Sequence, residues 1–80
     1  MDALHTHMPN IEVINASDDK SLVCYQSLII PRIGDSISWT REDGKSFTAD
    51  VSWIQHEVVK GNVVNICKRI FVSVDNIEEW

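Results

Sequence analysis

Hydrophobic and polar residues alternate along several stretches of this chain with the two-residue period of β-strands. Short runs that contain Gly, Pro, Asn or Asp, the usual turn residues, separate these stretches. The last residues, 75–80, have Asp75 three positions before Glu78, which predicts a short C-terminal helical turn. The pattern therefore predicts five strands, over residues 11–14, 22–30, 36–41, 46–59 and 63–74.

The composition strengthens the prediction of an all-β protein. Ile and Val together number 19, whereas Leu and Ala number 3 each. β-Branched side chains pack well on a pleated sheet and lose rotamer freedom in a helix. A chain of 80 residues has room for one domain. We expect residues 1–10 to form a flexible N-terminal tail and residues 11–80 to form a single small β-barrel domain.

The first long hairpin has a register that its turn predicts. A three-residue loop over 42–44 places Trp39 opposite Phe47 and Ile37 opposite Ala49, with the loop glycine at the left-handed position that such loops require. A two-residue loop would instead place the two aromatic residues on opposite faces. We therefore expect the three-residue loop.

The second long hairpin has a two-residue turn signal at Gly61–Asn62. That turn opposes Trp53 to Ile70 and Val51 to Val72. The two hairpins then select one common face, which we expect to form the core: Ile37, Trp39, Phe47, Ala49, Val51, Trp53, Ile70, Val72 and Val74.

The core face of the second hairpin is interrupted by the polar residues Gln55, Glu57 and Lys68. We expect the hairpin to bend or to project beyond the body at this point. A β-bulge near Cys67 is the alternative.

A strongly bent antiparallel meander of about five strands is expected to close into a barrel, because closure removes exposed strand edges. The run Pro31-Arg32-Ile33-Gly34-Asp35, which precedes an amphipathic strand, resembles the start of many small bacterial barrel modules of the Src-homology-3-like type. This resemblance implies a binding or scaffolding module and transfers no catalytic residue.

The second hairpin has an apolar pair on the face that points away from the predicted core. The register places Ile54 opposite Arg69 and Ser52 opposite Phe71, so Ile54 and Phe71 are diagonal neighbours. We expect another part of the chain or another molecule to cover such an apolar pair and shield it from water. The cover is either the N-terminal part of the chain, which includes Tyr25, or a partner or second subunit. The candidate protein-binding residues are Ile54, Phe71, Arg69 and Tyr25.

The charge balance limits the partners. The chain has 12 acidic and 7 basic residues, a net charge of −5. This balance disfavours direct binding to nucleic acid or to an anionic membrane, and it permits a basic protein partner. The first residues lack the pattern of a signal peptide, and two cysteines do not make a disulfide scaffold. We therefore expect a cytoplasmic protein.

Metal binding has few candidate ligands in this sequence. His5 and His7 form a His-x-His pair in the tail, and the register opposes His56 to Cys67. A structural zinc site needs about four ligands in tetrahedral geometry, and nothing in the sequence brings these two pairs together. We expect no metal and no other cofactor.

Catalysis has one candidate set, Asp50, Ser52 and His56, which alternate along one side of the same strand. Ser52 and His56 are nevertheless about 13 Å apart in an extended strand. That separation is too large for a nucleophile and its base, so we expect no enzyme.

These observations predict a non-enzymatic protein-interaction module, with a homodimer as one form of it. The alternative is a small acidic inhibitor, of the phage or plasmid type, that blocks a basic, nucleic-acid-binding protein. Its motivation is the set of acidic pairs at loops and at the tail: Asp18–Asp19, Glu42–Asp43 and Glu78–Glu79.

Overall fold

Five strands form a single sheet in the computed structural model, which describes residues 8–61 and 65–80. The all-β prediction is confirmed, and the described residues contain no helix that could span a bilayer. Of the predicted tail, residues 1–7 lie outside the described residues, and Asn10 already belongs to the first strand. The strands are β1 (Asn10–Asn15), β2 (Ser21–Gln26), β3 (Ser36–Thr40), β4 (Ser46–Lys60) and β5 (Asn65–Glu79).

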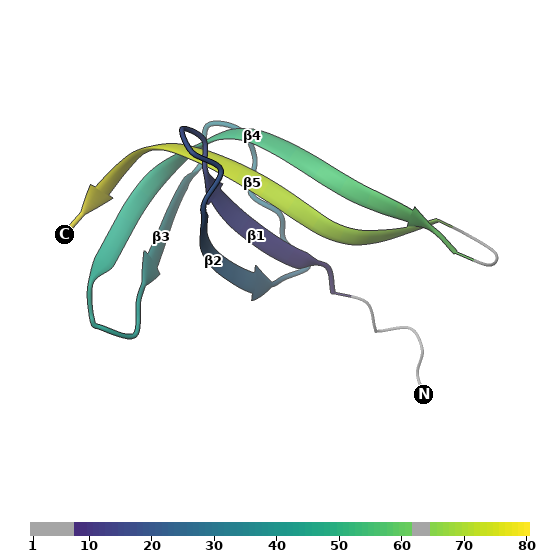
Figure 1. Cartoon of the computed structure of the whole chain (residues 1–80), viewed down its shortest axis with the longest axis horizontal. Helices are drawn as coiled ribbons and strands as arrows, with labels where there is room; N and C mark the ends of the chain where they lie inside the picture. The colour runs from purple at the N-terminus through teal and green to yellow at the C-terminus, as the bar shows by residue number, and fades with distance from the viewer. Residues whose placement is uncertain (1–7, 62–64) are drawn as a thin grey trace.

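The sheet has the strand order β2-β1-β5-β4-β3 and is mixed (Figure 1). Three of its ladders are antiparallel, but β1 pairs with β5 in parallel, with Ile11 opposite Ile70 and Val13 opposite Val72. The prediction of a wholly antiparallel meander is therefore wrong. The parallel ladder sets four fully or almost fully buried aliphatic side chains next to one another, a packing that no local turn signal reveals.

The sheet curls into a half-barrel and leaves two edges. Figure 1 shows β4 and β5 arching over β1, β2 and β3. β2 and β3 are the two edge strands and do not pair with each other, so the predicted closure into a complete barrel is wrong. The connection over residues 27–35 carries the chain from one edge to the other.

The core lies on one face of the curled sheet, which we call the inner face. The opposite face is called the outer face. Residues on β2, β3 and the connection between them pack against the core from the edges, because the curl brings both edge strands toward it. The buried residues of the core are Ile11, Val13, Ala49, Val51, Ile70, Val72 and Val74.

The hairpin of β3 and β4 has the predicted register. Trp39 lies opposite Phe47, and Ile37 lies opposite Ala49. The two aromatic rings stack, with their centroids 5.6 Å apart and their planes at 19°. Gly44 adopts a φ of 87°, the left-handed conformation that the three-residue loop requires.

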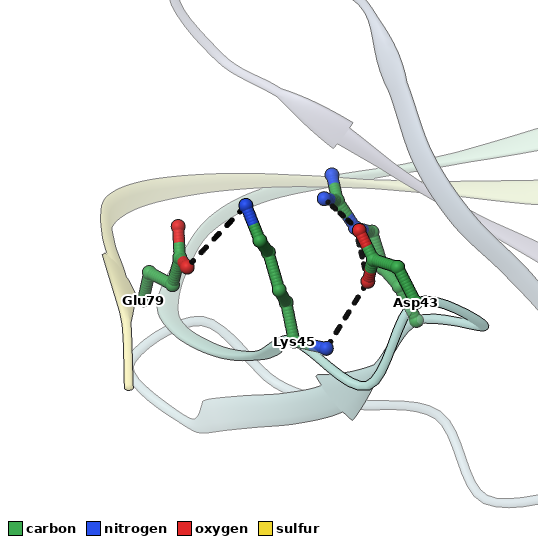
Figure 2. Close-up of polar contacts among 4 residues, drawn as sticks. Asp43, Lys45 and Glu79 are labelled. Atoms are coloured by element: carbon green, nitrogen blue, oxygen red, sulfur yellow. Dashed lines mark hydrogen bonds and ion pairs between the residues drawn. The ribbon is translucent and has the colours of Figure 1, made fainter.

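The loop of this hairpin is held by polar contacts around Asp43 (Figure 2). The Asp43 carboxylate accepts hydrogen bonds from the Arg41 guanidinium at 2.7 Å and from the Lys45 backbone N–H at 3.1 Å. The Arg41 hydrogen bond is the main reason that the pKa of Asp43 is lowered, and the Lys45 N–H adds to the effect. The Lys45 ammonium reaches across to Glu79 at 3.9 Å, which links the loop to the end of β5.

The predicted C-terminal helical turn is wrong, because β5 continues to Glu79. Glu79 lies opposite Phe47 in the β4–β5 ladder, and the Trp80 backbone N–H donates to the Ser46 carbonyl at 2.8 Å. Pairing with β4 satisfies backbone groups of the tail along its β4 side, whereas one helical turn leaves most of its end groups without partners. Ile77 packs against the core as part of this extension.

Candidate functional site

The β4–β5 ladder contains three register shifts, and these decide which side chains reach the outer face. The shifts lie between Thr48 and Asp50, between Val51 and Trp53, and between Glu57 and Val58. Each shift adds one residue to one strand and inverts the alternation of faces beyond it.

The second of these bulges turns Trp53 outward. Val51 lies opposite Val74, but Trp53 lies opposite Ser73, so Ser52 is the extra residue in β4. The Ser52 hydroxyl donates to the Ser73 carbonyl at 3.2 Å. The predicted opposition of Trp53 to Ile70 is therefore wrong, and Trp53 is 58% exposed instead of buried in the core.

The same bulge separates the predicted apolar pair. Ile54 lies opposite the buried Val72 and packs against the core on the inner face. Phe71 lies opposite Gln55 and remains on the outer face, as predicted. The patch expected from Ile54 and Phe71 does not form. The Ser52 bulge puts Trp53 on the outer face near Phe71 and Ile54 on the inner face.

The other two predicted binding residues lie in different places. Arg69 lies opposite Glu57, not Ile54, and its guanidinium carbon is 5.6 Å from the centre of the Phe71 ring. Tyr25 lies opposite the buried Ile11, so it shares the inner side of the β2 edge. Burial raises the pKa of Tyr25. The structure brings Arg69 and Phe71 together and leaves Tyr25 apart from them.

A groove on the outer face, which we call the aromatic groove, is the candidate site. It has a volume of about 550 Å³. β1, β4 and β5 supply most of its wall, and the turn between β1 and β2 supplies the rest. It is lined by Glu12, Ile14, Ala16, Asp19, Ser52, Trp53, Gln55, Phe71 and Ser73.

The charged residues around the aromatic groove are mainly acidic. Arg69 donates to the Glu12 carboxylate at 3.2 Å, and its Nε lies 3.9 Å from the Glu57 carboxylate. The Arg69 charge is therefore shared between two carboxylates. Glu12 and Asp19 are the charged residues among those that line the groove, so its lining carries negative charge only.

The third bulge confirms the alternative expected near Cys67. Lys68 is the extra residue, because Glu57 lies opposite Arg69 while Val58 lies opposite Cys67. The β4–β5 hairpin also projects beyond β1, as Figure 1 shows. The projection and the bulge near Cys67 are therefore both present, but Gln55 and Glu57 lie on the outer face because of the earlier bulge at Ser52.

The candidate metal ligands weighed in the sequence do not gather within the described residues. His56 lies opposite Ile70, not Cys67, although its Nδ1 is still 4.0 Å from the Cys67 Sγ. His5 and His7 lie outside the described residues. Across residues 8–61 and 65–80, no group of three His, Cys, Asp or Glu side chains could hold a metal ion.

The three residues of the candidate catalytic set also lie apart. Asp50 accepts hydrogen bonds from Ser36 and Asn76, while Ser52 lines the aromatic groove. His56 lies opposite a buried residue of the inner face, because the bulge at Ser52 breaks the alternation that placed all three on one side.

No protein-family model, no curated protein and no solved structure matches this chain. The resemblance to Src-homology-3-like modules therefore gains no support, and the mixed, open sheet departs from the closed antiparallel barrel that it implied. The aromatic groove is thus the feature of this fold from which a function can be inferred.

Trp53 lies on the face opposite to the one that simple alternation predicts. The signal that could have found it is the spacing of Val51 and Ile54, which both belong to the core yet are three positions apart. An odd spacing between two inward residues of one strand requires a bulge between them.

Proposed function

We propose that this protein is a non-enzymatic protein-interaction module and that the aromatic groove is its docking surface. The observation that carries the proposal is the exposure of Trp53 on the outer face beside Phe71. Tryptophan is enriched among the residues that contribute most to protein–protein binding, because it buries a large area on association. Of the large apolar side chains in the groove, Trp53 is exposed, and Phe71 and Ile14 are half-buried beside polar residues.

The support of the groove by three paired strands favours this role. β5 lies between β1 and β4, so its groove residues, Phe71 and Ser73, are held by ladders on both sides, while Trp53 is held by its pairing with Ser73. A surface held by paired strands needs little reordering when a partner binds, which lowers the cost of association. The separation of Asp50, Ser52 and His56 supports the non-enzymatic part of the proposal. Cys24 and Cys67 are both free thiols, which fits the further proposal of a reducing, cytoplasmic location.

Site-specific photo-crosslinking tests the docking surface. A benzophenone amino acid replaces Trp53 in the full chain, and irradiation is carried out in the cells that make the protein. The matched control carries the same group in place of Trp80, which is 79% exposed and lies at the end of the chain beyond β5. We expect a discrete protein adduct from position 53 and none of that mass from position 80.

Competition makes this experiment specific. An excess of the unmodified chain should suppress the adduct, whereas an excess of the Trp53→Ser chain should not. An adduct of twice the mass of the chain would identify the homodimeric form. Identical adduct patterns from both positions would overturn the proposed docking surface.

A further inference from the structure

We propose that the aromatic groove binds a basic segment of a partner protein, with an arginine side chain placed over the Trp53 indole and beside the carboxylates of Glu12 and Asp19. This inference rests on the proposed function and adds the chemistry of the partner.

The charge of the groove favours a cationic occupant. Its lining includes two carboxylates, Glu12 and Asp19, and no basic side chain. The nearby Arg69 is engaged by Glu12 and Glu57, so it does not offset both lining carboxylates. A segment that enters the groove therefore meets net negative charge, which a cation complements.

The Trp53 indole offers an uncovered surface for that cation. The fold places an arginine over each of its two phenylalanines: Arg41 lies 4.8 Å from the centre of Phe47, and Arg69 lies 5.6 Å from the centre of Phe71. Among the described residues, no such contact covers Trp53. Indole binds a cation more strongly than a phenyl ring does, so the exposed Trp53 indole is a favourable surface for a cation of a partner that enters the groove.

The combination of an indole and carboxylates favours arginine over lysine. A guanidinium is planar, stacks on an aromatic face and presents several N–H donors in that plane. It can therefore contact the indole and a carboxylate at the same time. Glu12 and Asp19 line the same groove as Trp53, so one site offers both an indole and carboxylates to a guanidinium.

The same carboxylates disfavour a second copy of the chain and a nucleic acid as occupants. A second copy docked groove to groove would bring Glu12 and Asp19 of each chain toward those of the other, with no cation in the lining to separate them. Like charges placed face to face disfavour association. A nucleic acid would bring phosphates to the same carboxylates.

Peptide binding tests the inference on the full chain. The probe is a fluorescein-labelled octapeptide of alternating arginine and serine, and two analogues carry citrulline or lysine in place of arginine. Citrulline keeps the shape of the side chain and removes its charge. Fluorescence anisotropy should show that the citrulline peptide binds about tenfold or more weakly than the arginine peptide, with the lysine peptide between them. Binding of the arginine peptide should weaken as salt rises.

Four variants locate the binding. Trp53→Leu should weaken binding of the arginine peptide about tenfold, whereas Trp80→Leu should leave it unchanged. Asp19→Asn should weaken binding several-fold, and Glu78→Gln, which removes the same charge outside the groove, should not. Asp19 has a φ of 60°, a conformation that asparagine also tolerates, so this variant keeps the turn. A urea midpoint for each variant checks that the chain remains folded.

Two results would overturn the inference and leave the docking surface intact. One is a crosslinked partner at position 53 whose binding is insensitive to salt and to Asp19→Asn. The other is self-association in sedimentation experiments that Trp53→Leu removes. Equal binding of the arginine and citrulline peptides, or equal effects of Trp53→Leu and Trp80→Leu, would overturn it directly.

Discussion

The hairpin of β3 and β4 and the hairpin of β4 and β5 share a strand, yet their ladders differ. The first runs in unbroken register from Ser36 opposite Asp50 to Thr40 opposite Ser46. The second contains three bulges. In the first hairpin, alternation along the chain alone fixes which side chains face the core. In the second, the face of a residue depends on how many bulges precede it.

The difference shows how a small sheet can form both a core and a binding surface from the same strands. The regular hairpin places its two aromatic residues, Trp39 and Phe47, on the inner side, where they stack. The bulged hairpin turns Trp53 outward while the apolar residues on either side, Val51 and Ile54, stay inward. Because Ser52 is accommodated as a bulge, Trp53 reaches the outer face, where it lines the aromatic groove.

The largest expected effect comes from deleting one residue of β4. One deletion removes Thr48 from the part that pairs regularly with β3, and the other removes Ser52 from the bulge. Deletion of Thr48 from the regular part puts Phe47 out of phase with Ala49, so Phe47 leaves the inner face. We expect a loss of about 3 kcal/mol in the free energy of unfolding, as for the removal of a large aromatic side chain from a core. Deletion of Ser52 keeps Val51 inward and Trp53 outward, and costs mainly one hydrogen bond, about 0.5–1.5 kcal/mol. Urea denaturation measures both losses, and equal losses would contradict the contrast.

Two of the residues with a positive φ, one in each hairpin, allow a second, smaller test. Gly44 turns the regular hairpin with a φ of 87°, and Asn76 lies at the first bulge with a φ of 53°. Gly44→Ala should cost about 1–2 kcal/mol through the backbone alone, because an added Cβ meets no atom within 4 Å. Asn76→Ala should cost more, because it also removes the hydrogen bond to Asp50 at 3.0 Å. Asn76→Gly should recover part of that loss, and thermal unfolding of the three variants gives the order.

The smallest expected effect concerns the loop of the regular hairpin. The hydrogen bond from Arg41, and then the one from the Lys45 N–H, hold the pKa of Asp43 below its ordinary value. A carboxyl whose pKa is lower in the folded state stabilises that state above its unfolded pKa, and the contribution disappears as the pH falls through the folded pKa.

The free energies of unfolding of wild type and Asp43→Asn should therefore differ slightly at about pH 7 and converge as the pH falls toward about 2. Glu42→Gln is the control, because it removes the same charge and leaves the Arg41–Asp43 contact in place. A difference that grows in acid would contradict the assignment of this contact.

The sequence sufficed to predict the regions where local signals and tertiary contacts agree. The turn at Gly44 fixed the register of the first hairpin, and β-branched composition indicated an all-β fold. Phe71 was placed on the outer face correctly. In contrast, the Asp75–Glu78 capping pattern favoured a helical turn, but pairing with β4 satisfies more of the backbone there and prevails.

Two structural features that the sequence did not predict depend on contacts between distant parts of the chain. The outward position of Trp53 results from a bulge that no turn residue marks. The parallel pairing of β1 with β5 joins Ile11 to Ile70, and hydrophobic alternation does not specify which strands become neighbours. The candidate site is built where both features meet, which is why the sequence indicated Phe71 and Arg69 but not the groove around them.

The parallel ladder has a consequence for how the chain assembles. β1 and β2 form one piece that is continuous in sequence, β3 to β5 form another, and the β1–β5 ladder is the joint between them. A cut in the connection over residues 27–35 therefore divides the chain into two halves, and their shared seam has the aliphatic pairs Ile11–Ile70 and Val13–Val72 on its inner face and the Arg69–Glu12 ion pair on its outer face. Such halves are suited to reassembly when mixed, and the groove that spans the seam would reappear only when they dock correctly.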